Sequence, residues 1–178
     1  MIKQRLWPRH CVQDTWGAEL VKDLKIVENG VKIYKGTNPD VDSYSVFWDN
    51  KKLSETNLSA QLRERGITDI YTCGVAYDVC VGATTFDALA AGYRTILIDD
   101  CCRGVDLEDI TRTKEIIAER YGIVATSDQV MSMVQGKDRR WELGYKLAME
   151  IKKKLAQKSE DKSTAKEKIV SENKNNNG

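Results

Sequence analysis

The chain has 178 residues, of which 41% are apolar and 31% are charged, and its formal net charge is +1. This length favours a single domain, and the near-neutral charge gives no electrostatic reason to expect nucleic acid or an anionic membrane as a partner. The first residues contain no apolar signal-peptide core, and no apolar run has the length of a membrane span.

The five cysteines, at positions 11, 73, 80, 101 and 102, do not have the pattern of a disulfide framework. Their number is odd, and no pair has zinc-finger spacing, which argues against structural zinc. Free thiols are typical of a reducing compartment. We therefore expect a cytoplasmic protein, and a nuclear location is compatible with the same chemistry.

Short apolar segments alternate with helical patterns along most of the chain. We expect strands at 31–35, 70–75, 94–99 and 123–126, and helices at 54–65, 80–91, 107–120 and 127–135. The expected helix starts are Ser54, Asp106 and Ser127, and the expected ends are Gly66, Gly92 and Gly122. This alternation predicts an α/β protein, a three-layer α/β/α arrangement around a parallel sheet.

The composition changes at residue 152, beyond which few apolar residues occur. We expect a domain over residues 1–151, followed by a disordered charged tail over 152–178.

The segment from Gly74 to Val81 places a cysteine where an apolar strand turns into a helix. Unpaired N–H groups in the first turn of a helix favour a thiolate, so Cys80 is a candidate nucleophile. Taken alone, Cys80 could equally be a small buried residue. Lys35 could be a solvated lysine, and His10, the one histidine of the chain, could be a surface or core residue.

Several segments, taken together and in order, resemble the nicotinamidase branch of the isochorismatase-like cysteine hydrolases, in its animal form. The resemblance covers about residues 5 to 150. The matching segments are Leu6-Trp-Pro-Arg-His-Cys-Val-Gln-Asp-Thr-Trp-Gly-Ala-Glu-Leu20, Tyr34-Lys-Gly-Thr37, Asp42-Ser-Tyr-Ser-Val-Phe47, Cys73-Gly-Val-Ala-Tyr-Asp-Val-Cys-Val-Gly-Ala-Thr84, Ala91-Gly-Tyr-Arg-Thr95 and Asp99-Asp-Cys-Cys-Arg-Gly104.

The resemblance implies that Cys80 is the nucleophile and forms a thioester with the acyl group of nicotinamide, in NAD salvage. Lys35 would lie near the thiol and favour its ionised form. The N–H groups of Ala76 and Cys80 would form the oxyanion hole, with a cis peptide bond between Val75 and Ala76.

The same resemblance assigns binding roles to residues outside this turn. Trp7, Tyr44 and Tyr77 would wall the pyridine ring of the substrate. His10 would be one ligand of a divalent metal, with zinc as the first choice, that holds the ring nitrogen or a water molecule beside the nucleophile. The expected partner is therefore a small molecule, nicotinamide, and a homo-oligomer is compatible with the family.

The chain departs from the family at its start. The catalytic Asp and the other metal ligands of the family precede the Trp-Pro-x-His segment, and only six residues precede it here. We therefore expect this chain to correspond to the C-terminal part of a longer enzyme, without the N-terminal strands and with an incomplete metal site. Alone, it is expected to be inactive and only marginally stable. A short isoform and a shortened gene model are equally compatible with this.

Two other functions stay open. One is a related hydrolase, such as an isochorismatase acting on a vinyl ether. The other is a catalytically inactive chain that pairs with the complete enzyme.

Overall fold

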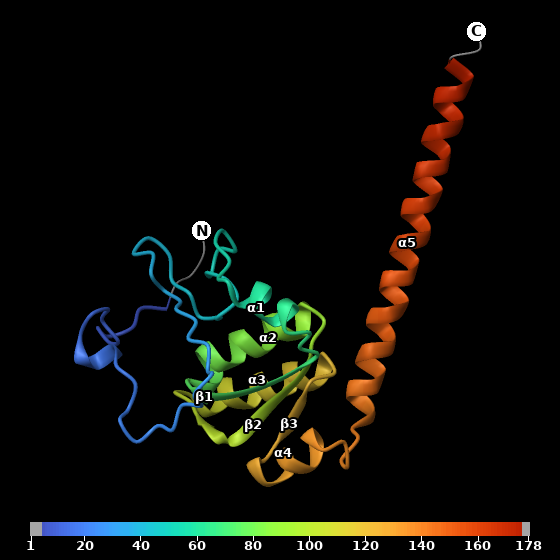
Figure 1. Ribbon diagram of the computed structural model, residues 1–178. Coiled ribbons are helices and arrows are strands. Elements are labelled where there is room, and N and C mark those ends of the chain that lie inside the picture. The colour runs from blue at the N-terminus through green and yellow to red at the C-terminus, as the bar shows by residue number, and fades with distance from the viewer. Residues whose placement is uncertain (1–4, 176–178) are drawn as a thin grey trace.

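A parallel three-stranded sheet forms the centre of the molecule (Figure 1). The computed structural model describes residues 5–175, and only the backbone over 159–175. The strands are β1 (Asp69–Val75), β2 (Arg94–Arg103) and β3 (Ile123–Ala125), in the order β1-β2-β3. Both neighbouring pairs are parallel, so the expected parallel pairing of the last three strands is confirmed.

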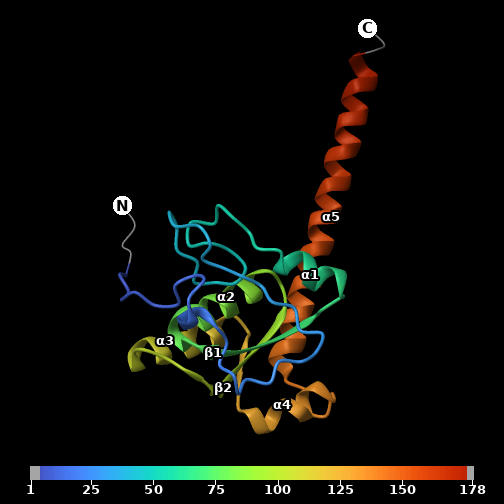
Figure 2. The same cartoon turned by 60° about the vertical axis from the view of Figure 1, so that its left-hand side comes forward.

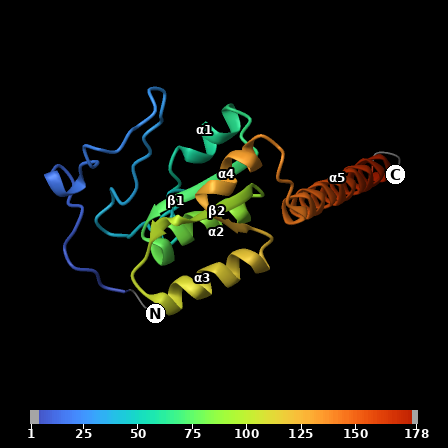
Figure 3. The same cartoon turned by 90° about the horizontal axis from the view of Figure 1, so that it is seen from below.

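Helices cover both faces of this sheet (Figure 3). One face carries the π-helical turn η2 (Tyr77–Val81), α2 (Gly82–Ala90) and α3 (Leu107–Glu119). The other carries α4 (Ser127–Val134) and the start of α5 (Trp141–Asn175). The remaining helices are α1 (Leu58–Glu64) and the short η1 (Trp16–Ala18). The expected three-layer α/β/α arrangement is confirmed.

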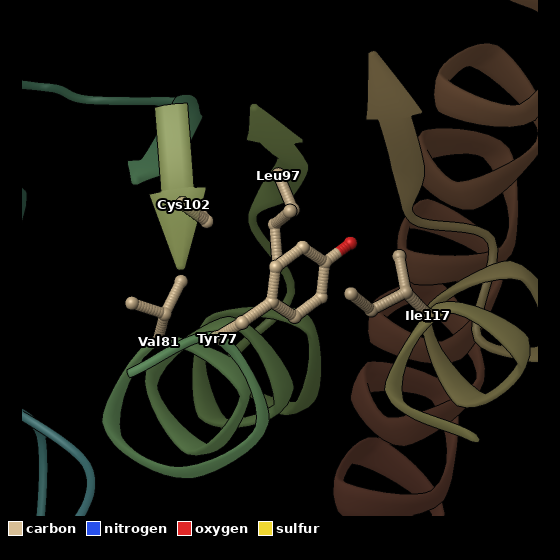
Figure 4. Close-up of a cluster of buried hydrophobic side chains, with 5 residues drawn as sticks. All are labelled: Tyr77, Val81, Leu97, Cys102 and Ile117. Atoms are coloured by element: carbon tan, nitrogen blue, oxygen red, sulfur yellow. The ribbon is translucent and has the colours of Figure 1, made fainter. Parts of the chain in front are cut away.

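Each face of the sheet packs its own apolar cluster. Figure 4 shows the first cluster, in which Tyr77 and Val81 of η2 meet Leu97 and Cys102 of β2 and Ile117 of α3. The second cluster comprises Ile96, Ile123, Ala125 and Met133. Successive side chains of a strand point to opposite faces, so a strand covered on both faces is apolar at consecutive positions such as Ile96 and Leu97.

Most helix ends agree with the sequence. The Asp106 side chain accepts hydrogen bonds from the N–H groups of Glu108 and Asp109, as an N-cap does. Gly66 has φ +62° directly after α1, and Gly92 has φ +91° after α2. Left-handed φ values of this kind are typical of glycine at helix ends.

The expected start of the helix at Ser54 is wrong, because α1 begins only at Leu58. The backbone around Ser54 forms part of a loop instead. The Ser54 N–H group donates to Asp49 Oδ2 at 2.5 Å, and Trp48 and Glu55 form an isolated antiparallel bridge.

The expected strand at 31–35 is also wrong. This segment has no regular secondary structure and pairs with no strand, and Val31 and Tyr34 are 50% and 74% exposed. Short alternating apolar patterns form stable strands only where a neighbouring strand pairs with them.

Over residues 152–175 of the expected tail, α5 continues through Asn175 and projects away from the sheet (Figures 1 and 2). Residues 176–178 of that tail lie outside the described residues. The segment 145–175 contains neither proline nor glycine and is rich in lysine, glutamate and alanine, which are good helix formers. Near the sheet, the Tyr145 ring packs on the Tyr121 ring with 4.7 Å between centroids. Among the described residues, none of the helices has both the length and the apolar character needed to cross a membrane.

Candidate active site

Cys80 lies at the carboxyl end of β1, the edge where parallel sheets place their sites. The strand ends through Gly74, which has φ +118°, and through a cis peptide bond between Val75 and Ala76, as the resemblance implies. The Ala76 carbonyl then accepts hydrogen bonds from the N–H groups of Val79 and Val81, which closes the turn η2. This turn leaves the Cys80 thiol half-buried rather than enclosed in the core.

Lys35 lies against this thiol. Its Nζ atom is 3.3 Å from Cys80 Sγ and donates a second hydrogen bond, of 2.6 Å, to the Ser43 carbonyl oxygen. The chain turns directly after Lys35, at Gly36 with φ +66°. The structure therefore brings together two predicted site residues that are 45 positions apart in the sequence.

The loop that carries Ser43 is fixed by side-chain hydrogen bonds to α2 and to Thr56, which precedes α1. Thr84 Oγ1 of α2 accepts from the Val46 N–H group at 3.1 Å. Thr56 Oγ1 donates to the Val46 carbonyl oxygen at 2.7 Å. The next residue, Phe47, is only 2% exposed. Lys35 thus reaches the thiol from a loop whose position depends on Val46 and its two partners.

A groove of about 370 Å³ opens beside the thiol along the free edge of β1. Its polar lining comes from Cys80, Thr84, Thr72 and Cys73, and the remainder is mainly apolar. The apolar and aromatic lining comprises Val46, Phe47, Leu58, Leu62, Ile70, Tyr71, Val75 and Val81. This volume lies within the usual range of small-molecule sites.

Trp7 and Tyr44 contact each other, since Trp7 Nε1 donates to the Tyr44 hydroxyl at 3.1 Å. Both side chains are partly buried. The Arg5 guanidinium lies over the Trp7 ring, 5.4 Å from its centroid. The structure thus pairs two of the three residues expected to wall a ring. Tyr44 of this pair directly follows Ser43, whose carbonyl oxygen binds Lys35.

Tyr77 lies elsewhere, in the core between the sheet and α3 (Figure 4), and this corrects the expectation that it walls the ring pocket. It is 3% exposed, and its hydroxyl donates to Asp99 Oδ1 at 2.9 Å. Burial, with further contributions from the hydrogen bond and the charge of Asp99, raises the pKa of Tyr77 far above its usual value. The turn η2 places Tyr77 and Val81 in the same cluster, facing the sheet and α3.

His10 is exposed, and its Nδ1 atom lies 2.6 Å from the Pro8 carbonyl oxygen. Within residues 5–158, no group of three or more histidine, cysteine or acidic side chains is arranged to hold a metal ion. The described residues therefore do not fit a metal centre around His10.

Sequence reasoning assigned no role to three residues that shape the site. Ser43 binds Lys35 through its carbonyl, and Thr84 binds the loop. Asp78 accepts from the N–H groups of Val105 and Asp106, which ties η2 to the start of α3. All three lie within the motif segments given above. The motifs could therefore have pointed to these residues, whereas the periodicity of apolar residues could not.

Comparison with known proteins shows the family of this chain. The family described as "Isochorismatase domain" matches residues 1–129. The nicotinamidase of Escherichia coli (strain K12) is 42% identical over 107 residues, which are 60% of this chain and 50% of that protein.

Two solved structures are similar. One is the Acinetobacter baumanii nicotinamidase, with a TM-score of 0.68 and 36% identity, covering 71% of this chain and 62% of that one. The other is the Pyrococcus horikoshii pyrazinamidase in complex with zinc, with a TM-score of 0.59 and 42% identity, covering 68% of this chain and 63% of that one.

The chain spans about half the length of the curated relatives it matches. The family match nevertheless covers most of the chain, and it includes the loop of Lys35, the turn of Cys80 and all three strands of the described sheet. The chain therefore belongs to the isochorismatase domain family.

Proposed function

We propose that this chain carries the nucleophile of a nicotinamidase, an amide hydrolase that converts nicotinamide to nicotinate and ammonia in NAD salvage. The observation that carries the proposal is the contact of 3.3 Å between Lys35 Nζ and Cys80 Sγ at the carboxyl end of β1. A cation at this distance stabilises a thiolate relative to a thiol. The relatives of this chain include nicotinamidases, which supports the same activity.

In the proposed reaction, Cys80 Sγ attacks the carboxamide carbon and forms a tetrahedral oxyanion. The backbone N–H groups of Ala76 and Cys80 stabilise this oxyanion. The C–N bond breaks as the nitrogen takes up a proton, which releases ammonia and leaves a thioester. Water then attacks the thioester carbon, so that nicotinate leaves and the Cys80 thiol is restored.

The pyridine ring is proposed to bind beside the Trp7–Tyr44 pair, and Tyr77 supports the turn from the core. Aromatic side chains stack on flat rings, and their hydrogen bond fixes the two rings relative to each other. Because the described residues do not form a metal centre around His10, no step of the reaction above is routed through a metal.

We further propose that residues 1–178 alone turn over nicotinamide slowly. Among the described residues, Cys80 Sγ accepts a hydrogen bond from Lys35, which is a cation and not a carboxylic acid that could transfer the proton. Asp78 is the carboxylate closest to Cys80 in sequence, but it accepts hydrogen bonds from the backbone N–H groups of Val105 and Asp106. A positioned proton donor typically contributes about 10²–10⁴-fold to such reactions. We also propose a cytoplasmic location, since all five cysteines are free thiols in this structure.

The test separates addition to Cys80 from complete turnover. Nicotinaldehyde, the aldehyde analogue of nicotinamide, is added with ¹³C at its carbonyl carbon, and NMR follows the carbon of a thiohemiacetal. We expect this signal with the unaltered chain and its loss with Cys80→Ser, while Cys11→Ser retains it. Ammonia release from nicotinamide is measured in parallel. A thiohemiacetal signal that persists in Cys80→Ser would refute Cys80 as the nucleophile.

A further inference from the structure

Two exposed thiols lie on neighbouring strands of the sheet, outside the Lys35–Cys80 contact. Cys73 is on β1 and Cys101 is on β2, and both are exposed. In the parallel ladder, Gly74 is opposite Cys102 and Val75 is opposite Arg103. Cys73 therefore directly precedes Gly74, and Cys101 directly precedes its partner Cys102.

Both thiols lie on the same face of the sheet. Cys102 is 4% exposed and belongs to the cluster with Tyr77 and Ile117, on the face covered by α3. Cys101, the residue before it, is exposed, so its side chain is directed away from this cluster. Thr72 Oγ1 lies 2.8 Å from Thr85 Oγ1 of α2, so Cys73, the next residue of β1, is directed to the face opposite α2, as Cys101 is.

The spacing of the strands suits a disulfide at this position. Neighbouring strands are about 4.8 Å apart, and disulfides join Cα atoms that are roughly 4.4–6.8 Å apart. The register shifts between the pairs Thr72–Leu97 and Gly74–Cys102, so Cys73 and Cys101 end this irregular stretch, each one residue before the restored pair. Burial, and then the charge of Cys101, raise the pKa of Cys73, which agrees with two neighbouring sulfur atoms.

We propose that Cys73 and Cys101 form a reversible disulfide with a low-molecular-weight disulfide, such as oxidised glutathione, as the oxidant. The Cys73 thiolate attacks one sulfur of oxidised glutathione, forms a mixed disulfide and expels one glutathione thiolate. The Cys101 thiolate then attacks the Cys73 sulfur and expels the second glutathione. Two protein thiols lose two electrons and two protons, and one molecule of oxidised glutathione becomes two of reduced glutathione.

The other cysteines differ in ways that make them controls. Cys102 is buried, and its thiol donates to the Ile98 carbonyl oxygen at 3.1 Å. Cys80 contacts Lys35 and would react with glutathione by itself. Cys11 is exposed in the N-terminal segment, far along the chain from the sheet, so we expect it to form only a mixed disulfide with glutathione.

The experiment uses the full chain with Cys80→Ser, which removes the competing nucleophile. The protein is equilibrated with oxidised and reduced glutathione, alkylated, digested with trypsin without reduction, and analysed by mass spectrometry. We expect the peptide containing Cys73 to be joined to the peptide 95–103, with a combined mass two hydrogens below the sum of the free peptides. Dithiothreitol should separate them.

Second substitutions assign the bond, since peptide 95–103 contains both Cys101 and Cys102. Adding Cys102→Ser should leave the linked peptide unchanged. Adding Cys101→Ser should abolish it and leave glutathione on Cys73. Circular dichroism checks that each variant is folded. A linked peptide that survives Cys101→Ser, or glutathione adducts alone on both thiols of the folded protein, would overturn the proposal.

Discussion

The sheet region, residues 69–134, and the N-terminal segment, residues 5–57, are held in place by different interactions. The sheet region has two ladders of parallel pairing and an apolar cluster on each face. The N-terminal segment has one three-residue helix and one isolated bridge, and its contacts are mostly hydrogen bonds from side chains to backbone. The proposed site takes its nucleophile from the first region and its lysine from the second.

This difference shows which parts of a site depend on core packing. The turn of Cys80 rests on buried apolar side chains, which contribute several kcal/mol each. The loop against which Lys35 lies is held by single hydrogen bonds at Val46, which contribute about 1 kcal/mol each, and by one buried side chain, Phe47. Substitutions in the two regions should therefore separate loss of folding from loss of the lysine–thiol contact.

The largest effect is expected from Leu97→Ala in the sheet region. Leu97 is 0% exposed and packs against Tyr77 and Ile117, so its truncation leaves a cavity and should lower the free energy of unfolding by about 3 kcal/mol. Urea denaturation followed by circular dichroism measures this. The matched substitution Leu20→Ala, at a residue that is 53% exposed, should change the free energy by less than about 0.5 kcal/mol. Equal losses in the two variants would contradict the division between the regions.

The next effect concerns the contact between the regions. Lys35→Gln removes the cation beside Cys80 Sγ, so alkylation of Cys80 by iodoacetamide at pH 7 should slow by roughly tenfold. Peptide mapping by mass spectrometry follows Cys80 separately from the other thiols. Lys35→Arg keeps the charge and should retain most of the rate, whereas Lys32→Gln, an exposed neighbour, should leave it unchanged. An unaltered rate in Lys35→Gln would mean that the contact does not activate the thiol.

A smaller effect is expected from Tyr77→Phe. The ring stays in the core, but the hydrogen bond to Asp99 is lost, so the free energy of unfolding should fall by about 1 kcal/mol. Asp99 keeps its ion pair with Lys114, at 2.7 Å, which limits the loss. Alkylation of Cys80 and binding of nicotinaldehyde should be unchanged. Weaker nicotinaldehyde binding with unchanged stability would instead return Tyr77 to the wall of the ring pocket.

The smallest effect is a change with pH in the N-terminal segment. Desolvation alone would raise the pKa of Asp49, but hydrogen bonds from the backbone N–H groups of Leu53, Ser54 and Lys51 outweigh it and hold this pKa below its usual 3.8. A carboxyl whose pKa is lowered by folding adds stability above its unfolded pKa. This stability is lost as the pH falls through the folded value.

The measurement is hydrogen exchange of the amides of residues 51–54 between pH 6 and pH 3, corrected for the intrinsic rates. Their protection should fall towards the acid end in the unaltered chain and should be low throughout in Asp49→Asn. Asp40→Asn, on an exposed turn, is the control and should match the unaltered chain. Protection that is independent of pH in the unaltered chain would contradict this role of Asp49.

Periodicity predicted the sheet region well, because its residues are buried on both faces. Consecutive apolar residues such as Ile96 and Leu97 indicated a covered strand, and Gly66 and Gly92 indicated helix ends. The same reasoning failed at 31–35, because alternation alone does not supply a pairing strand. It also failed at Ser54, because the Ser54 N–H group donates to Asp49 Oδ2 within a loop instead of starting a helix.

The candidate site was predicted from motifs rather than from periodicity. The contact of Lys35 with Cys80 depends on a loop that is fixed by Ser43, Val46 and Thr84, and no pattern in the sequence shows which carbonyl will bind the lysine. Tyr77 was misplaced for a related reason. A residue three positions before the nucleophile can face the site or the core, and the π-helical turn directs it to the core.

The projecting helix α5 has a hydrodynamic consequence. Its 35 residues correspond to a rod about 52 Å long. A compact protein of 178 residues has a radius of gyration of only about 16 Å, so the helix extends well beyond a compact shape. A monomer of this shape meets more friction than a sphere of equal mass. It should sediment slowly and elute early from a sizing column, so an elution volume alone would overstate its mass. Light scattering or sedimentation equilibrium, which do not depend on shape, would give the true value.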